Sequence, residues 1–203
     1  MKNMNKTKRL ALLSLFIAIE LVLMLTPLGY IPIGPLKATT LHIPVILITL
    51  LLSWKEGAII GAVFGFTSVV MNTITPTPVS FVFSPFYSLG EFQGNFSSLI
   101  IAIIPRIAIA FVAYGVFVYL KKWKVKESLS VILASIAGSL CNTILVMSGI
   151  FIFFGQSYAA AKEIAFDSLF ALIATTITTN GVLEAVCGAF IIGSIYQALK
   201  IRK

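Results

Sequence analysis

The chain has 203 residues, 59% of them hydrophobic and 11% charged, whereas soluble domains average about 25% charged residues. Its long unbroken apolar runs exclude a soluble domain and also lack the alternating pattern of a membrane β-barrel. The formal charge of +8 does not indicate a nucleic-acid partner, because the basic residues flank the apolar runs, where charge sets membrane orientation.

Six apolar segments predict an all-α integral membrane protein with six transmembrane helices in a single domain, residues 1–203. In chain order, the expected helices are Leu10–Pro27, Ile43–Trp54, Gly57–Met71, Phe96–Leu120, Leu129–Phe154 and Asp167–Leu199. A span needs roughly 20 apolar residues, so the second helix is too short to cross a bilayer upright. We interpret the first segment as a retained helix, because no small-x-small cleavage site of a signal peptide follows it.

The distribution of basic residues predicts the orientation. If both termini are cytoplasmic, the inner segments hold twelve of the 15 basic residues and the outer segments only Lys37 and Lys162, while Arg106 lies within a span. This is a strong positive-inside bias. We therefore expect both termini in the cytoplasm and the segments Tyr30–His42, Asn72–Asn95 and Gln156–Phe166 on the outer face.

Small residues recur along one face of two helices, which lets a second backbone approach closely. The third helix carries them at every fourth position, namely Gly57, Gly61 and Gly65. We interpret these glycines as internal packing. The first helix carries Ala11, Ser14 and Ala18, and here two readings stay open: internal packing, or an outward-facing strip that docks a partner membrane protein.

The segment Asn72–Asn95 differs from an ordinary connection between spans. It contains four Phe, one Tyr and three Pro but no Lys or Arg. Long loops of this kind are usually functional, so we expect it to fold over a binding cavity as a lid. Its prolines would limit the entropy lost on closing.

Polar residues at membrane depth are costly and are therefore candidates for function. Asn142 and Asn180 both fall near mid-depth of their predicted helices, and Thr176, Asn180 and Glu184 share one face at i, i+4 spacing. An amide both donates and accepts, which suits a ligand with hydroxyl and amide groups. The alternative for the asparagines and for Glu184 is a helix–helix hydrogen bond.

Cationic groups are few outside the cytoplasmic clusters. Arg106 follows Pro105, which frees a carbonyl one turn earlier, and it either pairs with Glu20 or binds an anionic ligand. Lys37 and His42, in the first outer segment, are further candidates for anion recognition. His42 is equally well explained as a satisfied loop histidine.

We expect no enzyme, cofactor or metal. The only histidine lies outside the predicted spans, and the sequence has neither a metal-ligand cluster nor a Gly-rich phosphate loop. Cys141 and Cys187 lie within apolar runs and are interpreted as buried small hydrophobes. An intramembrane enzyme would need paired acids at one depth, for which only Glu20 and Glu184 are available.

Several stretches resemble the substrate-binding S components of energy-coupling factor (ECF) vitamin transporters. They are Lys37-Ala-Thr-Thr-Leu-His-Ile-Pro-Val-Ile, Ser53-Trp-Lys-Glu-Gly, Gly65-Phe-Thr-Ser and the run from Asn72 to Phe86. The resemblance extends from about Leu10 to Lys200. The combined Thr-Thr-Leu-His-Ile-Pro and Ser-Phe-Val-Phe-Ser-Pro signature is most similar to the pantothenate-specific branch.

The resemblance implies a multi-pass protein of the bacterial cell membrane that captures one vitamin from outside. A separate transmembrane T component and two cytosolic ATPases would supply the energy. The family's first helix docks on the T component through an Ala-x-x-x-Ala strip, and Ser14 and Ala18 occupy the matching positions. Ser14 departs from that motif but keeps the surface small.

The resemblance also implies ligand roles. Asn142 and Asn180 match asparagines of riboflavin-binding relatives, but Leu183 replaces a lysine that those relatives often carry, which argues against riboflavin. For pantothenate, the expected substrate-binding residues are Lys37, Thr40, His42, Asn72, Phe83, Tyr87, Arg106, Asn142, Thr176 and Asn180. Phe81 and Phe86 would join Phe83 and Tyr87 around the dimethyl end. The alternatives are a pyridoxine-like or riboflavin ligand, or an autonomous small-solute carrier.

Overall fold

The computed structural model describes residues 5–33 and 36–201, without the side chains of residues 30–33, 36–38, 200 and 201. The helices are α1 (Lys6–Leu25), α2 (His42–Leu51), α3 (Trp54–Ile74), α4 (Phe96–Lys122), α5 (Glu127–Ala161), α6 (Phe166–Thr176) and α7 (Val182–Ile201). Short helical turns are η1 (Pro27–Gly29), η2 (Ser80–Val82) and η3 (Ile177–Gly181). Two antiparallel hairpins pair β1 (Tyr30–Ile33) with β2 (Leu36–Thr39), and β3 (Ser88–Leu89) with β4 (Phe92–Gln93).

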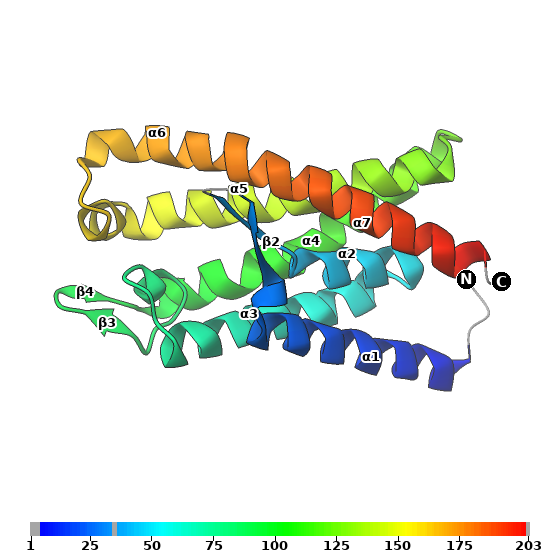
Figure 1. Cartoon of the computed structure of the whole chain (residues 1–203), viewed down its shortest axis with the longest axis horizontal. Coiled ribbons are helices and arrows are strands. Elements are labelled where there is room, and N and C mark those ends of the chain that lie inside the picture. The colour runs from blue at the N-terminus through cyan, green and yellow to red at the C-terminus, as the bar shows by residue number, and fades with distance from the viewer. Residues whose placement is uncertain (1–4, 34–35, 202–203) are drawn as a thin grey trace.

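The helices form an elongated bundle (Figure 1). One end, here the terminal end, holds the start of α1, the α2–α3 turn, the α4–α5 connection and the end of α7 (Figure 1). The opposite end, here the loop end, holds the segment 75–95 and the α5–α6 connection (Figure 1). Both α1 and α2 stop partway along the bundle, and β1 and β2 lie where they stop (Figure 1).

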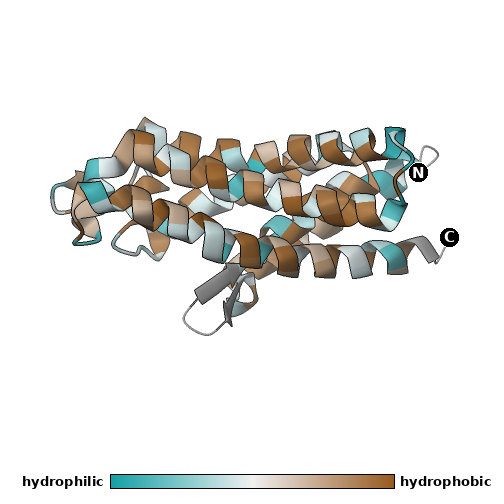
Figure 2. Cartoon of the chain, turned by 90° about the horizontal axis from the view of Figure 1, so that it is seen from above, coloured by the Kyte–Doolittle hydropathy of each residue, from teal (hydrophilic) through white to brown (hydrophobic). Residues whose placement is uncertain are grey.

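The described helices have the lengths and compositions of a membrane protein. Four continuous helices are long and apolar enough to cross a bilayer, and they are Trp54–Ile74, Phe96–Lys122, Glu127–Ala161 and Phe166–Leu199. Hydrophobic residues predominate along the helices, and hydrophilic ones gather at the two ends (Figure 2). The prediction of a helical membrane protein is confirmed. α2 is only 10 residues long, as the short second apolar segment predicted.

Helix boundaries follow local signals. α1 ends at Leu25 because Thr26 is extended ahead of Pro27. The Ser53 side chain accepts the Lys55 N–H at the start of α3, and Asn95 forms a capping box with Ser98 at the start of α4. These caps satisfy amides that a helix start leaves without partners.

Two helices run further than the sequence predicted. α3 continues to Ile74 and so includes Asn72, because no helix-breaking residue occurs before Pro76. α5 continues past Phe154 to Ala161, so much of the predicted outer connection Gln156–Phe166 is helical. The polar run after Gly155 led to the prediction of a loop, although Ala159 is buried and packs against Leu169 and Ile173 of α6.

The glycine positions of α3 pack against neighbouring helices. A Cβ at Gly61 would overlap the backbone carbonyl of Arg106, and one at Gly65 would lie 2.8 Å from the Ala102 oxygen. A Cβ at Gly57 would overlap the Thr49 side chain on α2. The interpretation of these glycines as internal packing is therefore confirmed.

Candidate functional site

The aromatic segment, residues 75–95, fills the loop end of the bundle. Phe81 and Val82 are fully buried and pack with Ile101, Val146 and Phe154 of α4 and α5. The rings of Phe92 and Phe154 lie 5.8 Å from that of Phe81, centroid to centroid. In contrast, Phe86 is 79% exposed. The segment is thus seated between helices by one face and open on the other.

Hydrogen bonds anchor this segment to α3 and α4. The Asn72 amide donates to the Ser68 carbonyl (2.8 Å) and accepts from the Ser80 hydroxyl (2.7 Å). The hydroxyls of Thr73 and Ser84 are 2.6 Å apart, and Ser98 donates to the Phe81 carbonyl at 2.7 Å. Asn72, a predicted ligand contact, therefore holds the segment in place, while Tyr87 lies half-buried in its apolar cluster.

Arg106 occupies the gap that Pro105 leaves in α4. Proline has no N–H, so the Ile101 carbonyl lacks its usual helical donor. The Arg106 guanidinium donates to that carbonyl at 2.7 Å. Its central carbon also lies 5.2 Å from the Phe64 ring centroid and 5.4 Å from that of Phe83, within cation–π range. Arg106 thereby links α3, α4 and the aromatic segment.

The proposed Glu20–Arg106 pair does not form in the described part of the chain, where no ion pair joins the two side chains. Glu20 is fully buried on α1, and both carboxylate oxygens lack a hydrogen-bond partner there. The sequence analysis noted that Pro105 frees a carbonyl one turn earlier, but it did not predict that the Arg106 side chain donates to that carbonyl, at Ile101.

Asn142 and Asn180 come from facing helices at one level. A Cβ at Gly181 would lie 3.0 Å from the Thr143 side chain, so the residues next to both asparagines are in contact. Asn180 lies in η3, a π-helical turn, and such turns are frequent at functional sites. The side-chain oxygens of both asparagines are buried without a hydrogen-bond partner in the described structure.

Two further buried polar atoms extend this group. Ser139, one turn from Asn142 on α5, is 2% exposed, and its hydroxyl has no partner within the described residues. Sequence reasoning missed it, since a serine in a helix usually bonds its own backbone. Thr176 does so: its hydroxyl donates to the Leu172 carbonyl at 2.8 Å. Buried polar atoms are normally paired, so the unpaired ones require an explanation.

His42 and Thr40 lie at the start of α2. The His42 ring is buried against α7, where a Cβ at Gly188 would lie 2.6 Å from Nε2, and Nε2 has no hydrogen-bond partner in the described part of the chain. The Thr40 hydroxyl donates to the Leu28 carbonyl at 2.8 Å. Lys37 lies in β2, but its side chain falls outside the described structure.

The structure therefore sorts the predicted residues into groups. Phe83 and Arg106 are in contact, Asn142 and Asn180 lie on neighbouring turns of facing helices, and Thr40 and His42 begin α2. Glu184, one turn beyond Asn180, accepts a hydrogen bond from the Thr39 N–H at 2.8 Å. This bond connects the third group to the helix of the second.

Comparison with known proteins gives the family of this chain. Residues 8–196 match the family described as "ECF transporter, substrate-specific component". The chain belongs to this family. It is also 38% identical, over 195 residues, to the pantothenic acid transporter PanT of Lactococcus lactis subsp. cremoris (strain MG1363). The match covers 91% of this chain and 96% of that protein. The S component is accordingly a multi-pass protein of the bacterial cell membrane.

The small residues of α1 face away from the rest of the S component. Ala11, Ser14 and Ala18 are all exposed. The buried face of α1 carries Phe16, Glu20 and Met24 instead, which at 3.6 residues per turn is the opposite side of the helix. The first helix therefore packs onto the bundle without using its small-residue strip.

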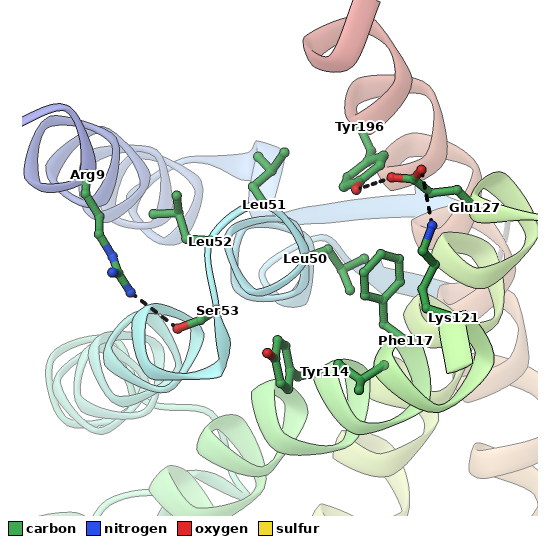
Figure 3. A pocket seen from close by; sticks show the side chains of 11 residues that line it. Arg9, Leu50, Leu51, Leu52, Ser53, Tyr114, Phe117, Lys121, Glu127 and Tyr196 are labelled. Carbon is green, nitrogen blue, oxygen red and sulfur yellow. Dashed lines mark hydrogen bonds and ion pairs between the residues drawn. The ribbon is translucent and has the colours of Figure 1, made fainter. Parts of the chain in front are cut away.

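A cavity of about 470 Å³ opens at the terminal end of the S component (Figure 3). Its floor is apolar, with Leu50, Leu51 and Phe117 among its lining residues. Most of the polar side chains around it are engaged with one another: Tyr196 donates to Glu127 at 2.8 Å, Lys121 lies 3.4 Å from the same carboxylate, and Arg9 donates to the Ser53 hydroxyl at 3.5 Å (Figure 3). Most of its polar groups are thus already engaged.

Proposed function

We propose that this S component binds pantothenate in the half of the bundle toward the loop end and supplies it to an ECF uptake transporter. The observation that carries the proposal is that the buried amide oxygens of Asn142 and Asn180, on facing helices, have no hydrogen-bond partner among the described residues. A buried acceptor without a donor costs about 1–3 kcal/mol, which a ligand that donates to it recovers.

Pantothenate fits these acceptors chemically. It carries two hydroxyls and one amide N–H, which are donors, on a compact branched frame with one carboxylate. Asn142, Asn180, the Ser139 hydroxyl and Thr176 receive the polar middle of the vitamin in this proposal. The half-buried Phe83 and Tyr87 line the dimethyl end, and Lys37 and Arg106 supply positive charge for the carboxylate. His42, Thr40 and Asn72 support the walls.

The finer topology is also part of the proposal. With six spans, both termini lie on one side of the membrane, and the cluster of basic residues at the terminal end supports the cytoplasm as that side. The whole chain, residues 1–203, then acts as one domain without enzymatic activity. A transmembrane T component and two cytosolic ATPases energise uptake, and the aromatic segment is the outer lid.

Ligand-induced thermal shifts across a vitamin panel test the choice of vitamin. A tight ligand stabilises the folded state by mass action, so pantothenate should raise the unfolding temperature of the purified protein in detergent. Riboflavin and pyridoxine should leave it unchanged. A shift with either of these, and none with pantothenate, would contradict the proposal.

Docking on the T component is tested separately. In Ala18→Trp, a large side chain replaces the small exposed one, which should abolish uptake by the full complex while leaving binding by the isolated S component intact. Ile152→Trp, on the 71% exposed Ile152 of α5, is the matched control and should transport normally. Equal loss of binding and uptake in Ala18→Trp would show that the substitution disturbs the S component itself, and would contradict a role of the strip in docking alone.

A further inference from the structure

The bond between Thr39 and Glu184 joins two parts of the chain that are 145 residues apart in sequence. Thr39 is the last residue of β2, and its N–H donates to a Glu184 carboxylate oxygen at 2.8 Å. Thr39 faces Tyr30 in the β1–β2 register, but this N–H is directed to α7. The hairpin is therefore tied to the long helix by a backbone donor and a side-chain acceptor.

Placing the Glu184 side chain within a transmembrane helix costs free energy, which makes it a candidate for a specific role. An acidic side chain within a transmembrane helix is expensive, and such residues are rarely retained for packing alone. A hydrogen bond to a carboxylate is roughly twice as strong as one between neutral groups, and a half-buried site preserves that strength. The bond thus contributes to holding the hairpin against α7.

The neighbours of Glu184 connect the hairpin with the candidate site. Asn180 lies one turn before it and Gly188 one turn after it, so the three share one face of the helix. Gly188 seats the His42 ring directly after the hairpin. Along this face, Asn180, whose amide oxygen has no partner in the described structure, is followed by Glu184, which accepts from the hairpin, and by Gly188, which contacts His42.

We propose that Glu184 is a positioning residue that holds the β1–β2 hairpin against α7 beside Asn180 and so slows the escape of the bound vitamin. This rests on the proposed function, because the retained ligand is the vitamin at Asn180. Glu184 does not touch the ligand. It acts through a hydrogen bond whose acceptor, the Glu184 carboxylate, is on α7 and whose donor, the Thr39 N–H, is on the hairpin.

Glu184→Leu and Glu184→Gln test whether Glu184 acts as the hydrogen-bond acceptor of the Thr39 N–H. Leucine keeps much of the volume but has no acceptor, whereas glutamine keeps an oxygen that accepts from Thr39. In ligand-free protein, amide exchange of residues 36–41 should become about tenfold faster in Glu184→Leu, with little change in Glu184→Gln and none in α4 or α5. The pantothenate dissociation rate should rise by about the same factor in Glu184→Leu alone.

Thr39→Pro removes the donor itself. Proline is tolerated at a strand position whose N–H makes no hydrogen bond to the neighbouring strand. The Thr39 N–H meets this condition, because it donates to Glu184. The effects of Thr39→Pro and Glu184→Leu on the dissociation rate should not add in the double variant, because both substitutions remove the same hydrogen bond.

Three results would overturn the proposal: unchanged hairpin exchange in Glu184→Leu, faster exchange throughout α4 and α5, or faster hairpin exchange with an unchanged dissociation rate. The failure of the proposed function is distinguishable. If the wild-type protein does not bind pantothenate, the exchange experiment on ligand-free protein still decides whether Glu184 holds the hairpin.

Discussion

Buried polar side chains are paired at the terminal end of this S component and unpaired midway toward the loop end. At the terminal end, Glu56 bonds to both Arg9 and Ser53, and Glu127 accepts from Tyr196. At the level of Asn142 and Asn180, the amide oxygens have no partner within the described residues.

The contrast separates structural polar groups from groups prepared for a ligand. A satisfied network gains nothing from a ligand that would have to break it, whereas an unpaired buried acceptor gains a hydrogen bond at once. The cavity at the terminal end has the volume of a small-molecule site, yet the charged side chains that line it, Arg9, Lys121 and Glu127, are already engaged. Unsatisfied hydrogen bonding is therefore the better guide to the vitamin site than open space.

The largest expected effect lies on the unpaired side of this comparison. Asn180→Leu should weaken pantothenate binding by more than tenfold, or about 1.4 kcal/mol or more, while leaving thermal stability unchanged or higher. Stability is spared because the substitution removes an unsatisfied buried acceptor. Calorimetric titration and thermal unfolding in detergent measure the two quantities.

Thr178→Val is the matched control for Asn180→Leu. Thr178 lies in the same turn, but it is exposed and its hydroxyl donates to the Ala174 carbonyl of its own helix. Its substitution should leave affinity unchanged. An Asn180→Leu variant that binds like the wild type would assign Asn180 a packing role.

Substitution of Arg106 tests whether a side chain that is already hydrogen-bonded in the loop-end half contributes to stability. Arg106→Gln should lower stability by about 1–3 kcal/mol, because the Ile101 carbonyl loses its donor. Adding Pro105→Ala restores a backbone N–H at position 105, so the double variant should regain that stability. Thermal unfolding of the single and double variants measures this.

The same variants decide whether Arg106 also binds the carboxylate. If it does, the Pro105→Ala/Arg106→Gln protein will be stable yet will bind pantothenate more weakly than wild type, and the loss will be smaller for the uncharged amide analogue. Equal losses for the two ligands would restrict Arg106 to its structural role.

The helices and their lengths were largely predictable from the sequence, and the reasons for the exceptions are physical. Apolar runs predicted α2 as a short helix and α4 almost to the residue. α5 was underestimated because Gly155 and the polar run after it resemble a connection, although its last turns pack on α6 through Ala159 and Leu169.

The candidate site was only partly predictable. The two asparagines were identified because amides at membrane depth are costly, and their side-chain oxygens are among the buried atoms without a partner in the described structure. Ser139, the bond from Arg106 to Ile101 and the bond from Thr39 to Glu184 depend on which helices face each other. No local sequence pattern encodes such long-range contacts.

The smallest expected effect lies on the paired side. Tyr196→Phe removes only the hydroxyl that donates to Glu127, so it should lower stability by about 1 kcal/mol and leave pantothenate affinity unchanged. Thermal unfolding and titration of this variant check both. A tenfold loss of affinity here would move the vitamin site to the terminal end and reverse the comparison.

Titration calorimetry of the wild-type protein and the Asn142→Leu/Asn180→Leu variant with pantothenate tests the central claim most directly. The account predicts saturable binding to the wild type and none to the double variant, with both proteins equally folded by thermal unfolding. Wild-type affinity in the double variant, or saturable binding of riboflavin in place of pantothenate, would contradict it.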